Sequence, residues 1–182
     1  KINSVHESIA SGHAYEVNLS QRFDVKIDGH DPNVYNRIFK SLAEMSPAPF
    51  STIIQCDDTV VISSSPELFL QINQNICTSK PIKGTRRRMG NFDTDEKNYL
   101  DLRTDEKDRA ENLMIIDLVR NDLGRVSQPG TVNTKDLFAI ETYATVFQMV
   151  STIQSRLAEH ATMMDAIKAA FPPGSMTGAP KI

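Results

Sequence analysis

Between residues 51 and 79 the chain carries four short segments that have the composition of β-strands. They are rich in Val, Ile, Thr and Phe and cover residues 51–56, 59–64, 68–73 and 75–79. Asp57-Asp58 and Gln74 lie between neighbouring segments and are suitable turn residues. The pattern predicts an antiparallel meander.

Helical patterns surround this meander. Apolar residues at helical spacing predict four helices, at residues 1–11, from Asp31-Pro32 to about Met45, from about 104 to 122, and at 162–171. Asp31 is placed to cap the second helix and Pro32 suits its first turn. Gly124 is placed to end the third helix.

The remaining segments complete an α+β prediction. Residues 14–26 alternate apolar and polar side chains, which predicts a strand, and residues 131–154 are expected to hold one or two more. Residues 84–97 are polar, basic and contain glycine, so we expect a loop there. Because helices and strands do not alternate as βαβ units, the class is α+β.

Composition excludes several classes of protein. The net charge of −3 over 182 residues gives no footprint for nucleic acid, and the basic group Lys83, Arg86, Arg87 and Arg88 suits an anionic small molecule equally well. No apolar run approaches the roughly 20 residues of a membrane span. Two cysteines fit a reducing compartment, so we expect a cytoplasmic protein. The chain begins inside a predicted helix and lacks an initiator Met, so we expect a partial domain, cut at both ends.

Two side chains are candidates for acid–base or nucleophilic chemistry. Lys83 follows a predicted strand, and three arginines stand within five residues of it, so its pKa can be lowered by neighbouring cations. Glu67 lies between three serines and an apolar strand, where burial would make it a general acid. By residue chemistry alone, a solvated loop lysine and a strand-edge glutamate are the commoner situations.

Two further segments have the chemistry of binding sites. Asp108 and Glu111 are three residues apart on a predicted helix and share a face, as carboxylates that hold Mg²⁺ do. An exposed, charged helix face is the alternative. The run from Gly174 to Lys181 has small residues and glycines whose backbone N–H groups suit a carboxylate, although a plain loop explains the run equally well.

Taken together, these segments resemble the chorismate-binding enzyme family. The resemblance runs the whole length of the chain in family order. It is carried by residues 14–23 (AYEVNLSQRF), 65–67 (SPE), 81–86 (PIKGTR), 105–112 (DEKDRAEN), 117–126 (DLVRNDLGRV), 150–152 (VST) and 174–181 (GSMTGAPK). The fold it implies is the anthranilate-synthase type, with two facing antiparallel sheets and flanking helices.

The resemblance also implies an activity. Lys83, where anthranilate synthases usually carry Ala, is the mark of the aminodeoxychorismate synthase type. In that type the lysine attacks chorismate, the residue at Glu67 protonates the departing hydroxyl, and ammonia from a glutamine amidotransferase partner then displaces the lysine. Anthranilate synthase component I and a non-catalytic chorismate- or tryptophan-binding fragment remain the alternatives.

By the same resemblance, further residues receive roles. Asp108 and Glu111 would supply half of an Mg²⁺ site, whose other carboxylates lie beyond Ile182, so we expect the chain alone to be inactive. Tyr15 and Asn18 fall on the regulatory or ligand-contacting strand. The substrate-binding residues would be Gly84, Thr85, Gly174, Ser175, Thr177, Gly178 and Lys181.

Three positions depart from the family pattern. Glu16 replaces the commoner Gln, and isochorismate and salicylate synthases carry a water-activating lysine there. Asp108 is shorter than the Glu of anthranilate synthases. Gln148 stands where many members have a catalytic-site His, and glutamine cannot take a proton. We also expect that open sheet edges of a cut domain favour self-association.

Overall fold

The computed structural model describes residues 1–27, 31 and 33–181. Its helices are α1 (Ile2–Ala10), α2 (Val34–Met45), α3 (Phe92–Thr104), α4 (Glu106–Gly124), α5 (Met163–Ala170) and α6 (Gly174–Thr177). Its strands are β1 (Glu16–Val17), β2 (Phe50–Cys56), β3 (Thr59–Ser65), β4 (Leu68–Asn73), β5 (Ile76–Lys80), β6 (Ile82–Arg87), β7 (Asn133–Thr142), β8 (Val146–Arg156) and β9 (Gly178–Ala179). The α+β prediction is confirmed.

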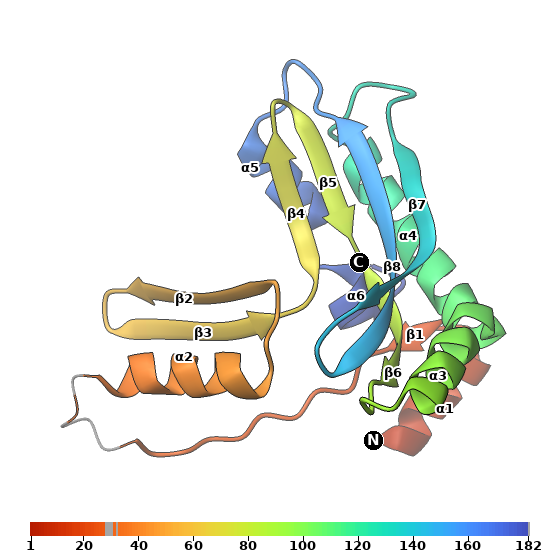
Figure 1. Ribbon diagram of the computed structural model, residues 1–182. Coiled ribbons are helices and arrows are strands. Elements are labelled where there is room, and N and C mark those ends of the chain that lie inside the picture. Colours follow the sequence, from red (N-terminus) through yellow and green to blue (C-terminus); the bar gives the residue numbers. More distant parts are fainter. Residues whose placement is uncertain (28–30, 32, 182) are drawn as a thin grey trace.

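A five-stranded antiparallel sheet forms the centre of the molecule (Figure 1). β8 pairs along one edge with β7. Along its other edge it pairs first with β5 and then with β6, so these two strands lie end to end and are separated by Pro81. β4 pairs with β5 at the outside. Lys83 is thus the second residue after the break at Pro81.

Helices α4 and α5 cover one face of this sheet (Figure 1). The core between them combines side chains of β5, β8, both helices and the residues that follow α4 and β8: Cys77, Ile116, Leu123, Val126, Ile153, Leu157, Ala166 and Ala169. A second cluster of Leu102, Phe147 and Met149 packs α3 against β8. Removal of these apolar surfaces from water is the main stabilising force of the fold.

A buried polar network also holds α4 to the sheet. The Asn112 Nδ2 donates to the Met149 carbonyl at 3.2 Å, and its Oδ1 accepts from the Ser151 hydroxyl at 2.6 Å. The Phe138 backbone N–H donates to the same Ser151 hydroxyl at 3.0 Å. Because these groups have partners, the hydrogen bonds offset the cost of removing them from water and hold the helix on β8 and β7.

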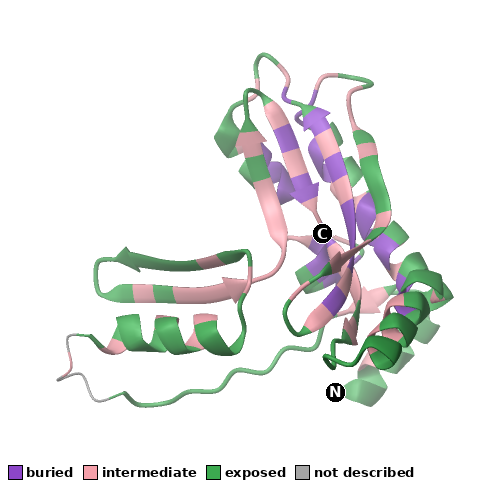
Figure 2. Ribbon diagram, viewed as in Figure 1, coloured by how far each residue is buried: buried purple, intermediate pink, exposed green. Residues whose placement is uncertain are grey.

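A second unit projects from the main sheet. It consists of α2 and the β2–β3 hairpin, and its described residues include no buried side chain (Figure 2). The predicted four-strand meander is therefore wrong: β2–β3 and β4–β5 are both hairpins, but they belong to different sheets. The chain turns between them at Pro66, where proline favours an extended approach.

Three local predictions are also corrected. Residues 14–26 form only the two-residue strand β1, because most of this segment has no pairing partner among the described residues. The predicted loop at 84–97 contains most of β6 and the start of α3, which Asn91 caps. α2 begins at Val34 with Asn33 as its N-cap, while Asp31 accepts from the Asn33 backbone N–H at 2.8 Å. The predicted place of Pro32 lies outside the described residues.

The buried face of α4 also differs from the predicted one. Leu113, predicted on the apolar side, is 48% exposed, whereas Asp108 is buried. Gly124 is the last residue of the helix and not a left-handed cap. The spacing of apolar residues predicted the wrong face because the buried face of α4 also contains polar residues whose hydrogen bonds are satisfied.

Candidate active site

The candidate site lies where three chain segments meet beside Pro81. β6 brings Lys83, the turn between β3 and β4 brings Glu67, and α6 brings Ser175. A fourth segment, β1, pairs antiparallel with β9 and brings Glu16 to the same place. Segments far apart in sequence thus place one amine, two carboxyl groups and a hydroxyl together.

Local backbone geometry displaces Lys83 from the regular strand. The register of β6 against β8 shifts between Ile82 and Thr85, so Lys83 and Gly84 form an irregularity in the ladder. Gly84 has φ +87, and a Cβ there would lie 2.9 Å from the side chains of Asp108 and Leu102. Glycine is therefore required at this position, both for its conformation and for the close packing against α3 and α4.

The Lys83 ammonium group is largely enclosed. It donates to Glu16 Oε1 in a short contact and reaches the Ser175 carbonyl at 3.5 Å. Only 15% of the Lys83 side chain and 19% of the Glu16 side chain are exposed. The Asn18 side-chain amide donates to the same Ser175 carbonyl at 3.3 Å. Lys83 is therefore not the solvated loop lysine that residue chemistry alone favours.

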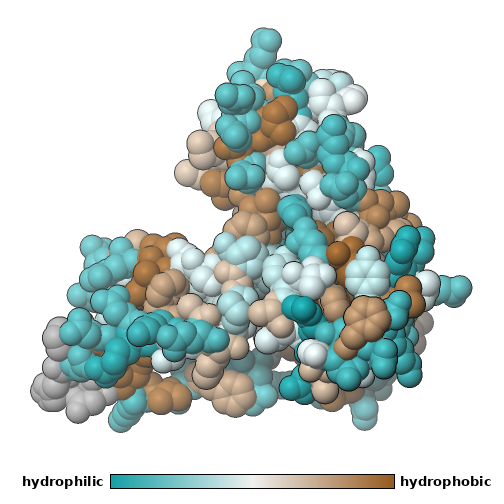
Figure 3. Space-filling view, viewed as in Figure 1, coloured by the Kyte–Doolittle hydropathy of each residue, from teal (hydrophilic) through white to brown (hydrophobic). Residues whose placement is uncertain are grey.

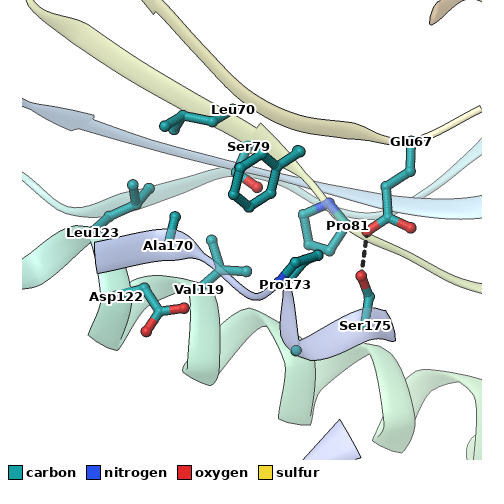
Figure 4. A pocket seen from close by; sticks show the side chains of 12 residues that line it. Glu67, Leu70, Ser79, Pro81, Val119, Asp122, Leu123, Ala170, Pro173 and Ser175 are labelled. Atoms are coloured by element: carbon teal, nitrogen blue, oxygen red, sulfur yellow. Dashed lines mark hydrogen bonds between the residues drawn. The ribbon is translucent and has the colours of Figure 1, made fainter. Parts of the chain in front are cut away.

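Glu67 lies on the other side of Ser175. Its Oε1 accepts from the Ser175 hydroxyl at 2.6 Å, and Figure 4 shows the two side chains pointing toward one another. Burial raises the pKa of Glu67 above its ordinary value, although the Ser175 hydroxyl, the Lys83 charge and the Ile82 backbone each oppose this rise. A carboxyl group with a raised pKa keeps its proton at higher pH and can act as a general acid.

A small cavity lies next to Glu67 and Ser175 (Figure 4). It encloses about 20 Å³, which is room for about one water molecule. Its lining comprises Glu67, Phe69, Leu70, Ser79, Pro81, Val119, Asp122, Leu123, Ala170, Pro173, Gly174 and Ser175. A ring-sized substrate does not fit inside, so it would have to reach Lys83 and Glu67 from the open side of the site.

The segment from Gly174 to Gly178 is held by its own backbone structure. Gly174–Thr177 form the single turn α6, Thr177 is exposed and its hydroxyl donates to the Pro173 carbonyl, and Gly178 belongs to β9. A Cβ on Gly174 would lie 2.9 Å from Leu118. The contact of the Gly174–Gly178 segment with a substrate carboxylate stays a prediction.

Lys181, another predicted substrate contact, is engaged within the protein. Its ammonium group donates to Asp122 Oδ2 at 2.6 Å and to the Ala170 carbonyl at 2.7 Å. This arrangement satisfies carbonyls at the end of α5 and neutralises a buried aspartate. Among the residues that the structure describes, Lys181 therefore links the end of α5 to Asp122 of α4.

The predicted metal carboxylates have cationic partners. Asp108 Oδ2 accepts from Arg86 at 2.8 Å, and Glu111 forms an ion pair with Lys107 at 2.9 Å. Arg86 also contacts Asp101 and Asp105, so this arginine of the basic run is enclosed by three aspartates. Within the described ranges, no group of three or more His, Cys, Asp or Glu residues is placed to hold a metal ion.

The other predicted residues lie at the margin of the site. The Tyr15 backbone N–H donates to the Ala179 carbonyl, while its side chain is 76% exposed. Thr85 is exposed on β6 and pairs in register with Gln148. The Gln148 Oε1 is buried and has no hydrogen-bond partner in the described part of the chain. Sequence reasoning missed the contact of Glu16 with Lys83; the unusual Glu at that position was its only signal.

Comparisons with known proteins agree on one family. A family profile described as chorismate binding enzyme matches residues 1–182. The chain is 42% identical to aminodeoxychorismate synthase component 1 of Klebsiella aerogenes over 182 residues, which is all of this chain and 40% of that protein. It is 38% identical over 181 residues to anthranilate synthase component 1 of Aquifex aeolicus, of which it covers 36%.

A solved structure supports the same fold. Anthranilate synthase component I from Streptococcus pneumoniae TIGR4 superposes with a TM-score of 0.85 at 30% identity, covering 99% of this chain and 38% of that one. The anthranilate-synthase-type fold is therefore confirmed, and the chain spans about 40% of the length of the relatives it matches. The match over all of its residues shows that the chain belongs to the chorismate-binding enzyme family.

Proposed function

We propose that the whole protein to which this chain belongs is an aminodeoxychorismate synthase component I, which converts chorismate and ammonia into 4-amino-4-deoxychorismate for p-aminobenzoate and folate synthesis. The observation that carries the proposal is the enclosed Lys83 amine beside Glu67, a carboxyl group with a raised pKa. The similarity to the Klebsiella aerogenes protein of that name supports it.

The two side chains divide one difficult displacement into two easier ones. The Lys83 nitrogen forms a bond to ring carbon 2 of chorismate, the ring electrons shift, and the bond between carbon 4 and its hydroxyl breaks. That hydroxyl takes the Glu67 proton and leaves as water. Ammonia then bonds to carbon 4, the electrons shift back, and the bond from carbon 2 to Lys83 breaks.

A product assay on the whole protein tests this reaction. With chorismate and ammonium chloride, we expect 4-amino-4-deoxychorismate, and we expect Lys83→Ala to abolish it while the protein remains folded. The similarity to anthranilate synthase component 1 of Aquifex aeolicus makes anthranilate synthesis the second candidate. Formation of anthranilate with free pyruvate, or unchanged amination by Lys83→Ala, would refute the proposal. Binding of chorismate without turnover would support the non-catalytic alternative.

We further propose an ammonia-supplying partner and a magnesium requirement. The name "component 1" of the relative supports a second component, a glutamine amidotransferase, and glutamine-dependent amination after its addition would test this. Asp108 and Glu111 offer two carboxylates, and Mg²⁺ commonly binds one or two of them together with substrate oxygens. Because Arg86 and Lys107 now pair with them, the ion would have to displace these partners. The Mg²⁺ dependence of chorismate binding, compared between Glu111→Gln and the unaltered protein, tests this site.

A further inference from the structure

The contact between Glu16 and Lys83 joins two residues 67 positions apart. Glu16 reaches Lys83 because β1 pairs with β9, with Glu16 opposite Ala179. Both side chains are more than four-fifths buried. A buried carboxylate at the nucleophilic nitrogen is in a position to exchange a proton with it.

The second oxygen of the Glu16 carboxylate is also enclosed. Glu16 Oε2 is buried and has no hydrogen-bond partner within the part of the chain that the structure describes. A carboxylate oxygen without a partner keeps its capacity to accept a hydrogen bond or a proton. Glu16 thus presents an unoccupied acceptor in the same carboxylate that contacts the Lys83 nitrogen.

The charges around Lys83 come from two elements. Among the described residues these are Glu16 of β1 and Glu67 of the turn between β3 and β4, while α6 contributes the Ser175 carbonyl. The Lys83 charge lowers the pKa of Glu67. Neutralisation of that charge by Glu16 therefore helps Glu67 to stay protonated.

We propose that Glu16 is the proton acceptor that converts Lys83 from an ammonium ion into the nucleophilic amine, an inference that rests on the proposed function. In this step one proton moves from the Lys83 nitrogen to a Glu16 oxygen, and the pair stays neutral overall. The freed electron pair on nitrogen then forms the bond to the substrate ring. Glu67 independently gives its proton to the leaving hydroxyl.

This arrangement has a specific pH signature. In the proposed step the proton stays within the contact between the Lys83 nitrogen and Glu16, so the transfer needs no proton from or to the solvent. Without Glu16, Lys83 would have to lose its proton to hydroxide from the solvent. The rate of a variant without the acceptor, divided by the rate of the unaltered protein, is therefore expected to rise with pH, and this ratio cancels the titration of Glu67, which both proteins share.

The chain offers a matched control. Lys80 and Glu141 form a second part-buried Lys–Glu pair in the same sheet, with Nζ and Oε1 2.5 Å apart and both side chains 32% exposed. This pair has no hydrogen bond to Glu67 or Ser175 among the described residues. Glu141→Gln removes the same charge from a similar pair outside the site.

The experiment measures covalent attachment of chorismate to Lys83 in the whole protein without ammonia, by rapid quenching and mass spectrometry between about pH 6 and pH 9. Without ammonia, the readout reports attack by Lys83 together with departure of the hydroxyl. We expect the unaltered protein and Glu141→Gln to share one pH profile, which falls where Glu67 loses its proton. For Glu16→Gln we expect a rate about 10²-fold lower at neutral pH, and its ratio to the rate of the unaltered protein should rise about tenfold per pH unit. Glu16→Asp should keep the profile of the unaltered protein at a reduced rate.

Two results separate the possible failures. A Glu16→Gln protein that attaches chorismate as fast as the unaltered protein, with the same pH profile, would overturn the role of Glu16 and leave the proposed function standing. An unaltered protein that forms no adduct on Lys83 would overturn the proposed function itself. If Glu16→Gln does not fold, as judged by its urea unfolding curve, a Glu16→Asp rate that rises with pH relative to that of the unaltered protein would still overturn the inference.

Discussion

Ser175 contacts Glu67, Lys83 and Asn18 at once. Its hydroxyl donates to Glu67, and its carbonyl accepts from both Lys83 and Asn18. The side-chain and backbone atoms of one buried residue thus fix the separation between the proposed nucleophile and the proposed acid. Such positioning by a rigid neighbour is how proteins hold reacting groups in place.

At the same scale, the raised pKa of Glu67 has a consequence for stability. The folded protein keeps this proton at pH values where the unfolded chain has lost it, so the stability contribution of Glu67 falls as pH rises through that window. Glu67→Gln removes the titration but keeps an oxygen that accepts from Ser175. We therefore expect the variant to gain stability relative to the unaltered protein as pH is raised, measured by urea unfolding at acidic and at mildly alkaline pH.

The same variant should lose activity. Without its proton donor, amination is expected to slow by about 10²- to 10⁴-fold, the usual contribution of a general acid. The urea unfolding curves serve as the control, because they show that Glu67→Gln is folded and is slow only for lack of a proton donor. A stability difference that does not change with pH would contradict the assigned protonation of Glu67.

At the scale of elements, the pairing of β1 with β9 carries Glu16 into the site. Gly178 has φ +98, and a Cβ there would lie 2.2 Å from the Glu16 carbonyl oxygen. The added Cβ would thus clash with backbone, and a backbone atom cannot move as a flexible side chain can. The two-residue ladder therefore depends on a glycine at this position.

Gly178→Ala should separate β1 from β9. We expect a loss of about 1–3 kcal/mol in unfolding free energy and faster hydrogen exchange at the Tyr15 amide, which donates to Ala179. Gly130→Ala is the control, because Gly130 also has positive φ but a Cβ there meets no atom within 4 Å. It should lose less stability and leave Tyr15 exchange unchanged. Equal effects of the two substitutions would show that the contact with Glu16 is unimportant.

At the scale of the whole molecule, much apolar surface is left open. α1 and the α2–β2–β3 unit contain no buried residues, and the segment before α2 exposes Phe23 at 79% and Val25 at 82%. Figure 3 shows the unit beside the main body, with a hollow corner between them. No helix among the described residues is both long and apolar enough to cross a membrane.

These exposed surfaces predict self-association of the 182-residue chain when it is produced by itself. Contiguous apolar surface and unpaired strand edges favour contact with further copies. We expect an apparent mass that rises with concentration in light scattering, together with binding of a hydrophobic dye. Substitution of Phe23 and Val25 by Ser, in a segment without buried neighbours, should reduce both signals. A monomer at high concentration would contradict this prediction.

Sequence reasoning located most elements and failed where pairing is long-range. α1, α5 and the β2–β3 and β4–β5 hairpins were predictable because their spacing and turns are local. The loop predicted at 84–97 contains most of β6 and the start of α3, and β6 was missed because it becomes a strand only by pairing with β8. Residues 14–26 alternate like a strand, yet only Glu16 and Val17 have a partner in the described chain. Alternation shows which residues can pair and not which will find a partner.

For this protein, the order of its motifs by itself determined the family and the α+β class and predicted catalytic parts for Lys83 and Glu67, since these inferences depend on residue identity along the chain. Only the tertiary structure decided that Glu16 contacts Lys83, that Ser175 joins Lys83 to Glu67, and that Lys181 and Arg86 serve internal carboxylates. The physical reason is that a side chain's protonation and partners depend on burial and on charges within a few ångströms. Those neighbours come from distant segments and are set by the packing of the sheet.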